Sequence, residues 1–139
     1  MTRLNATLTL VLLICGSAFA RPAVVFEQNR GQTADEVQFL ARAADSVVFL
    51  TRSAAVLKLP GQGVLTLKLL GAEMTQPRGE RPSTAAISYF TGSDPQQWRT
   101  NVPAYEAVRY AGVYRGIDLI YHAAGGAIEY AISQSLPPR

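Results

Sequence analysis

The segment 117-IDLIYHAAGGAIEYAI-132 contains two runs in which apolar and polar residues alternate. Alternation with a period of two is typical of a strand that buries one face. Residues 123–126 connect the two runs. Whether the turn takes two residues or four, each odd-numbered residue of the first run pairs with an even-numbered residue of the second. Either register therefore places polar Asp118, His122 and Glu129 on one face. The opposite face of this hairpin is predicted to be apolar and to carry Ile117, Leu119, Tyr121, Ile128, Tyr130 and Ile132.

Similar short runs occur upstream, at residues 37–42, 47–50, 55–59, 65–69 and 87–90, with turn-forming residues such as 60–63 between them. This spacing predicts an all-β fold, an antiparallel β-sandwich, with jelly-roll-like and barrel-like variants as alternatives. The polar segment 73–84 is predicted to be a mobile loop. Asp94 followed by Pro95 predicts one helical turn that reaches Trp98, because Asp suits the cap and Pro the first helical position.

The first twenty residues have the pattern of a secretory signal peptide. Arg3 is followed by a mostly apolar stretch at 4–15, and Ala18 and Ala20 mark a cleavage site. We therefore expect 1–20 to be removed and 21–139 to form a single β-rich domain that is secreted, periplasmic or at the cell surface. The apolar stretch is too short for a membrane-spanning helix, so no stable membrane span is expected after cleavage.

The leader also contains Cys15, the chain's one cysteine, so the mature domain is expected to have no disulfide. Acylation of Cys15 is the alternative, but Ile14 stands where a lipoprotein signal has a small residue. The 13 basic and 10 acidic residues are scattered, with a formal net charge of +3. The sequence has no run of basic residues that could contact successive phosphates of a nucleic acid, so no nucleic-acid partner is expected.

Several clusters of uncommon residues occur in a fixed order along the chain. The residues concerned are Asn29, Gly31, Gln32, Tyr89, Phe90, Gly92, Trp98, Arg99, Asn101, Tyr114, Gly116, Asp118, Tyr121, Glu129 and Tyr130. Together they resemble the uncharacterised domain that precedes the β-propeller repeats of bacterial SBBP-repeat surface proteins. The resemblance covers nearly all of 21–139, and departs from the family pattern at Ser88, Arg115 and Ala131.

That resemblance implies an exported, β-rich module at the N-terminus of a larger surface protein, with no established enzymatic activity. It implies structural roles for most of the shared residues. The partners that we expect are other extracellular domains or surface glycans. Family members continue beyond the position of Arg139, so we expect a chain truncated at its C-terminus or a stand-alone remnant.

Candidate catalytic residues are few. His122 has Glu129 as a cross-strand neighbour, but no nucleophile accompanies them, which favours a surface pair over a catalytic triad. Asp118 and Glu129 are the candidate pair for a glycosidase-type hydrolase, and the alternative is that each stabilises loops or pairs with Arg109 or Arg115. One histidine and scattered acids predict no metal site and no cofactor.

Aromatic residues are concentrated in the C-terminal third of the chain. Trp98, Tyr105 and Tyr110 are the candidate platform for stacking on sugar rings, and packing in the core is the other interpretation. Three functions remain open from the sequence. The favoured one is a non-catalytic structural or interaction module, followed by a carbohydrate-binding module and then by a hydrolase.

Overall fold

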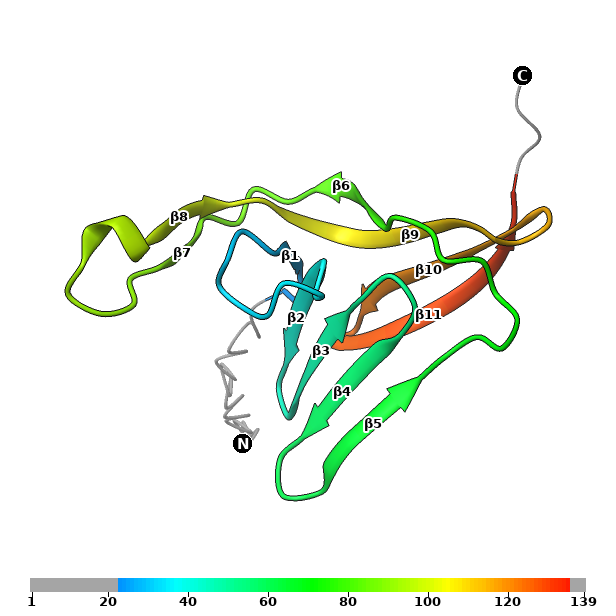
Figure 1. Ribbon diagram of the computed structural model, residues 1–139, viewed down its shortest axis with the longest axis horizontal. Helices are drawn as coiled ribbons and strands as arrows, with labels where there is room; N and C mark the ends of the chain where they lie inside the picture. Colours follow the sequence, from blue (N-terminus) through cyan, green and yellow to red (C-terminus); the bar gives the residue numbers. More distant parts are fainter. Residues whose placement is uncertain (1–22, 136–139) are drawn as a thin grey trace, which may run out of the picture.

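The computed structural model describes residues 23–135 (Figure 1). Its strands are β1 (Phe26–Gln28), β2 (Phe39–Ala43), β3 (Ser46–Leu50), β4 (Ala55–Leu59), β5 (Gly63–Leu67), β6 (Arg78–Pro82), β7 (Ile87–Tyr89), β8 (Arg99–Val102), β9 (Ala104–Tyr114), β10 (Ile117–Ala124) and β11 (Ala127–Gln134). One short 3-10 helix, η1 (Pro95–Gln97), lies between β7 and β8. The predicted all-β class is therefore confirmed.

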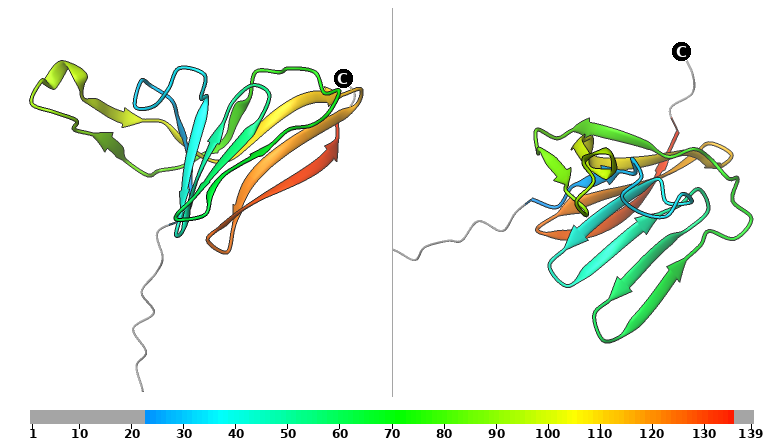
Figure 2. Two further views of the ribbon diagram at one scale, coloured as in Figure 1. Left: turned by 60° about the horizontal axis from the view of Figure 1, so that its bottom comes forward. Right: turned by 60° about the vertical axis from the view of Figure 1, so that its left-hand side comes forward.

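The main sheet has the strand order β11-β10-β9-β1-β2-β3-β4-β5, and β6 adds to β9 beside this path. Every pairing is antiparallel. The sheet curls on itself into a half-barrel, which corresponds to the barrel-like form of the expected fold (Figure 2). Strands β5 and β11 are the two free edges of this path, whereas β6 is a further edge strand that pairs with β9 alone. The half-barrel stays open between β5 and β11.

The C-terminal hairpin has the predicted register. Gly125 and Gly126 form a two-residue turn, and Tyr121 lies opposite Tyr130. On the predicted apolar face, the β10 residues Leu119 and Tyr121 are buried, but Tyr130 and Ile132 of β11 are 60% and 58% exposed. The alternation predicts which residues share a face, but β11 is an edge strand and its half of that face is left uncovered.

The core fills the concave side of the half-barrel. Phe26, Leu50 and Val108 are completely buried there, and residues from β2, β4, β9 and β10 pack around them. Burial of each large apolar side chain contributes roughly 1.5–3 kcal/mol. The core therefore joins strands from both halves of the chain and holds the curl of the sheet.

One predicted segment is wrong. Residues 73–84 were expected to be a mobile loop, but 78–82 form β6, which pairs with β9 through Glu80 and Ala107. The sequence Arg-Gly-Glu-Arg-Pro has no apolar alternation, so the usual strand signal is missing. Its pairing is instead stabilised by an ion pair between Glu80 and Arg109 of β9.

The helical turn after Asp94 is confirmed as η1, with Pro95 in its first turn. The Asp94 side chain accepts a hydrogen bond from the Gln96 N–H, which is the expected cap. Strands β7 and β8 pair with each other and, with η1, form an arm that projects from the sheet and leads into β9 (Figure 1).

The predicted leader at 1–20, its cleavage site and Cys15 lie outside the described residues. Within 23–135, no helix is long and apolar enough to cross a membrane.

Candidate functional site

The loop between β1 and β2 contains the first shared motif, and its side chains order its own backbone. Asn29 Nδ2 donates hydrogen bonds to the carbonyls of Ala34 and Val37, both at 2.8 Å. Asn29 Oδ1 accepts from the Gly31 N–H at 2.9 Å. Gln32 Nε2 donates to the Gln28 carbonyl at 2.8 Å. Each of these amides replaces a backbone partner that the irregular loop lacks.

Arg99 of β8 packs against the same loop. Its Nε donates to the Arg30 carbonyl at 2.8 Å, and its Nη1 to the Gln96 carbonyl at 3.3 Å. Gly31 lies beneath the guanidinium with φ +98°, and a Cβ there would come within 3.0 Å of Arg99 Nε. Glycine is favoured at this position for its backbone conformation and for the space that Arg99 occupies. The guanidinium therefore joins the arm to the loop.

A second contact between arm and sheet involves Tyr89, Glu27 and Arg42. The Tyr89 hydroxyl donates a short hydrogen bond to the buried Glu27 carboxylate, and Arg42 Nη2 donates to the same hydroxyl at 3.3 Å. Arg42 Nε also lies 3.8 Å from Glu27 Oε1. Burial and the hydrogen bond to Glu27 raise the pKa of Tyr89. This contact supplies partners to a buried carboxylate, which would otherwise be costly.

Asp118 is at the centre of a third polar cluster. Its carboxylate accepts hydrogen bonds from the Ser135 hydroxyl at 2.5 Å, the Gly112 N–H at 2.8 Å and Arg109 Nη1 at 2.9 Å. These contacts hold the pKa of Asp118 below its ordinary value, the Ser135 hydrogen bond most of all. Asp118 lies where the register between β9 and β10 shifts, so its carboxylate binds the irregular backbone. The alternative prediction that Asp118 pairs with Arg109 is confirmed.

The proposed hydrolase pair is not brought together. Glu129 lies opposite His122, four residues along β10 from Asp118, which corresponds to about 13 Å at the usual strand rise. Glycosidase carboxylates are about 5–9.5 Å apart. His122 Nε2 and Glu129 Oε2 lie 3.7 Å apart, which is the expected cross-strand surface pair.

The three candidate platform aromatics are also separated. Tyr110 is buried in the core, where its hydroxyl donates to the Thr51 carbonyl at 2.6 Å. Tyr105 is half-buried against the edge of Phe39. Trp98 alone is substantially exposed, on the arm, packed edge-on against Phe90. A common sugar platform of Trp98, Tyr105 and Tyr110 is therefore wrong.

The remaining shared residues have backbone or packing roles. The Trp98 indole N–H donates to the Gly92 carbonyl, and the Tyr114 hydroxyl to the Leu70 carbonyl. Asn101 takes a positive φ of 53°, which Asn tolerates better than most residues. The Gly116 carbonyl accepts from the Ser135 N–H at 2.8 Å. Tyr121 packs in the core between Tyr110 and Tyr130.

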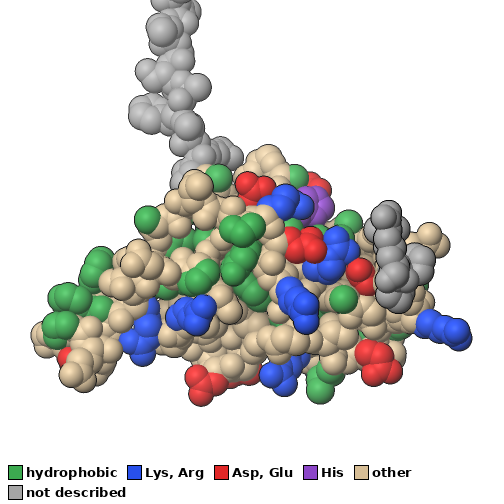
Figure 3. Space-filling view, turned by 90° about the horizontal axis from the view of Figure 1, so that it is seen from above, with side chains coloured by type: hydrophobic (Ala, Val, Ile, Leu, Met, Phe, Trp, Pro, Cys, Tyr) green, Lys and Arg blue, Asp and Glu red, His purple; other side chains and the backbone are tan. Residues whose placement is uncertain are grey.

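Acidic and basic side chains are interspersed on the face of the molecule seen from above, over β6 and β9 (Figure 3). A nucleic-acid-binding surface gathers one sign of charge, which this face does not. Within residues 23–135, no group of three or more His, Cys, Asp or Glu side chains is arranged to hold a metal ion.

The sequence did not predict the feature that stands out in the structure, an apolar opening between the two free edges of the half-barrel. We call it the mouth. It is formed by exposed side chains of β5, the loop that follows it and β11, namely Leu65, Leu67, Leu70, Met74, Tyr130 and Ile132. A hollow of about 350 Å³ lies inside it, lined by Leu67, Leu70, Met74 and Tyr130 with core residues beneath. Alternation indicates which face these residues share, but which strands become edges depends on the whole topology.

A family model described as a Domain of unknown function (DUF7948) matches residues 26–133. The match runs from the start of β1 almost to the end of β11, so it includes the β1–β2 loop, the arm, the mouth and the Asp118 cluster except Ser135. No curated protein and no solved structure matches the chain.

Proposed function

The chain belongs to the DUF7948 family of domains of unknown function, and from that premise we propose that it is a non-catalytic interaction module that docks through its mouth. The observation that carries the proposal is the exposure of large apolar side chains on the edge strands β5 and β11 and on the loop that follows β5. Leu70 is 88% exposed, Met74 73% and Ile132 58%. Contiguous exposed apolar surface on a folded domain marks an interaction site, because its burial against a partner is favourable.

The polar clusters support a non-catalytic role. Glu27 and Asp118 are the buried carboxylates of the described residues, and each is held by partners that order the backbone or the arm. A catalytic acid or base needs access to substrate and a proton to exchange. Asp118 has its pKa lowered rather than raised, which suits a permanently charged structural group.

The leader pattern at 1–20 supports an exported protein, because a signal peptide directs the chain out of the cytoplasm. The ordered set of motif residues supports a place at the N-terminus of a surface protein of the SBBP-repeat kind. In such a protein, the mouth would dock on an extracellular domain. Sequencing the N-terminus of the exported protein tests the leader, and the expected first residue is Arg21.

A matched pair of variants on β11 tests the docking surface. Ile132→Glu places a charge in the mouth, whereas the neighbouring Ala131→Glu places one on the opposite face of the same strand. We expect folded wild-type protein and Ala131→Glu to bind the neutral apolar dye Nile red, and Ile132→Glu to lose most of that binding. Near-UV circular dichroism must be unchanged, since loosely packed states also bind such dyes. Absence of dye binding by a folded wild-type monomer would contradict the proposal.

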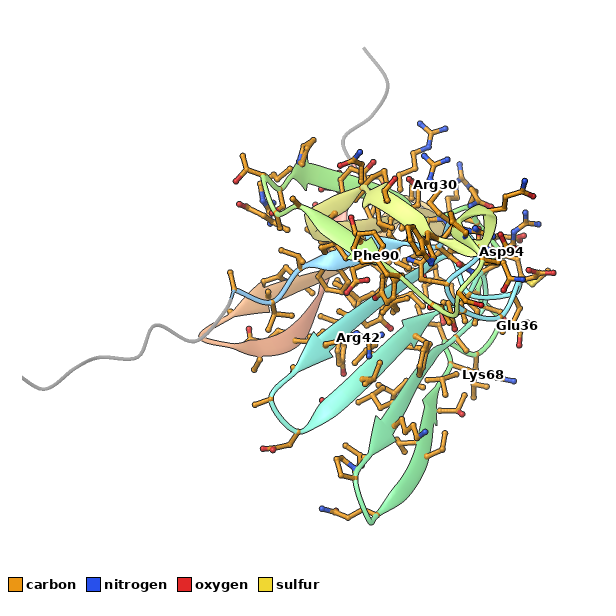
Figure 4. The ribbon with its side chains drawn as sticks, turned by 90° about the vertical axis from the view of Figure 1, so that its left-hand side faces the viewer. Arg30, Glu36, Arg42, Lys68, Phe90 and Asp94 are labelled. Atoms are coloured by element: carbon orange, nitrogen blue, oxygen red, sulfur yellow. The ribbon has the colours of Figure 1, made fainter. Side chains whose placement is uncertain are left out.

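Carbohydrate binding remains the second candidate, because Phe90 and Trp98 form an exposed aromatic pair at the end of the arm. Phe90 is 65% exposed, and the two ring centroids lie 5.3 Å apart. Phe90 is labelled in Figure 4, and it does not line either hollow of the mouth. A glycan array probed with the wild type and with Trp98→Ala tests it. Binding that the variant loses supports this function, and no binding to any cell-wall or plant polysaccharide would exclude it.

A further inference from the structure

We propose that the mouth is covered by a second copy of this chain, packed mouth to mouth with its strand directions reversed. The inference rests on the proposed function and names the partner of the same surface. Three features carry it, namely the continuity of the groove, the opposite charges at its ends, and the exposure of its apolar walls.

The mouth leads into one groove rather than into separate cavities. The hollow of about 350 Å³ and a second of about 420 Å³ are both lined by Leu67, Tyr121 and Tyr130. Leu67 belongs to one free edge and Tyr130 to the other. The two hollows therefore lie next to each other and form one groove, with Leu67 and Tyr130 in its walls. Such a long, shallow surface suits a protein partner better than it suits a small ligand, which usually binds in an enclosed pocket.

The two ends of the groove carry opposite charges. Arg52, in the turn between β3 and β4, and Lys68, at the end of β5, line one end together with Glu73. Figure 4 shows the Lys68 side chain pointing away from the ribbon, into solvent. Asp45, in the turn between β2 and β3, lines the other end, whereas the Glu129 side chain pairs with His122 on the opposite face of the hairpin. One end is therefore net basic and the other acidic.

This polarity selects both the partner and its orientation. A two-fold rotation that reverses the strands brings the basic end of each copy against the acidic end of the other, so the favourable contact occurs twice. Packing with the strands unreversed would instead bring Lys68 against Lys68 and Asp45 against Asp45. Complementary charges at the rim favour the first arrangement and like charges disfavour the second. A copy of this chain also supplies a matching apolar surface of equal length.

Charge reversal at the two ends gives a sharp test. Lys68→Glu and Asp45→Lys change exposed side chains, so both variants are expected to fold like the wild type. The full chain is expressed with its own leader and purified in the form that accumulates, and sedimentation velocity is measured over a range of concentrations. The wild type is expected to dimerise. Each variant alone is expected to dimerise roughly tenfold more weakly, because two attractive contacts become repulsive.

The mixture of the two variants is the decisive sample. In the reversed arrangement, the carboxylate introduced by Lys68→Glu in one chain meets the ammonium group introduced by Asp45→Lys in the other. The unchanged Asp45 and Lys68 meet at the opposite end. An equimolar mixture should therefore recover dimerisation close to that of the wild type. Recovery when Lys68→Glu is mixed with wild type, rather than with Asp45→Lys, would indicate unreversed packing and overturn the inference. A wild type that stays monomeric would also overturn it.

Nile red binding separates this inference from the proposed function. Dimers are expected to bind less dye than the monomers obtained on dilution, since the partner covers the mouth. If the wild type is a monomer that binds dye, the proposed dimer is rejected but the docking surface is not. If the wild type is a monomer that binds no dye, both the dimer and the docking surface are rejected. Dimers that bind dye as strongly as monomers show that the mouth is not their interface, which rejects the inference.

Discussion

At the scale of single residues, Asp118 joins β9, β10 and the end of β11 through one carboxylate. It accepts from the Gly112 N–H, from Arg109 and from the Ser135 hydroxyl. Hydrogen bonds to a charged group contribute about 1.5–3 kcal/mol. Asp118→Asn should therefore lower the free energy of unfolding by about 2 kcal/mol at pH 7, measured by urea denaturation. Asp35→Asn is the control, because this exposed carboxylate makes no ion pair or hydrogen bond within residues 23–135.

The pH dependence of that difference follows from the lowered pKa of Asp118. Its folded pKa lies below the unfolded value of about 3.9, so its stabilising contribution is fully present above that value. The contribution is lost as the pH falls through the folded pKa. The difference between the wild type and Asp118→Asn should be constant near neutral pH and shrink below about pH 4. A difference that grew on acidification would contradict the assigned role.

Gly79 is a second residue whose identity the packing requires. It lies in β6 beneath the ring of Tyr105, and a Cβ there would overlap the ring atoms Cγ and Cδ2. Movement of the ring is restricted because it also packs against Phe39 in a T-shaped arrangement. Gly79→Ala should cost about 1–3 kcal/mol of stability, as overpacking does. The cost should largely disappear in a Tyr105→Ala background, and an equal cost in both backgrounds would reject the packing explanation.

At the scale of elements, the arm of β7, η1 and β8 depends on two polar contacts with the rest of the molecule. One is the guanidinium of Arg99 on the β1–β2 loop, and the other is Tyr89 on Glu27. Tyr89→Phe removes the hydroxyl and leaves a buried carboxylate without one partner. Amide hydrogen exchange in 87–102 should become faster, corresponding to a local loss of about 1–3 kcal/mol, while β2–β4 keep their protection.

The matched control is Tyr130→Phe, since the Tyr130 hydroxyl makes no hydrogen bond within the described part of the chain. It should leave exchange in the arm unchanged. The raised pKa of Tyr89 adds a second signature. The stabilising contribution of Tyr89 is present below the ordinary tyrosine pKa near 10 and is lost as the pH rises through the pKa of Tyr89 in the folded protein. Amide exchange in the arm should therefore become selectively faster under alkaline conditions. Equal effects of both variants on the arm would contradict the contact.

Individual elements could be predicted from the sequence where local patterns determine them. Alternation placed Tyr121 opposite an even-numbered residue, and Asp94-Pro95 predicted the start of η1. Strand β6 was missed because its stability comes from partners on β9 rather than from its own alternation. The Asp118–Arg109 pair was one of several alternatives, since only the register shift between β9 and β10 aims the two groups at each other.

At the scale of the whole molecule, the sequence predicts an antiparallel all-β fold but not how the sheet closes. Closure depends on the order of all the strands, in which β5 and β11 come to lie at the two ends of one curled sheet. Leu65 and Ile132 have the alternation of core residues, and a local pattern does not distinguish a covered strand from an edge. For the same reason, the mouth could not be predicted, although all of its residues belong to ordinary strand or loop segments.

The central claim is that the half-barrel is open, with an apolar mouth between β5 and β11. Amide hydrogen exchange resolved to single residues tests it most directly, at a dilution where sedimentation shows only monomers. Within an edge strand, every second amide points away from the sheet and has no partner. The structure therefore predicts alternating protection along Ala127–Gln134 and along Gly63–Leu67, against continuous protection in β10 and β4. Continuous protection along β11 and β5 in the monomer would contradict the open half-barrel, and with it the docking surface.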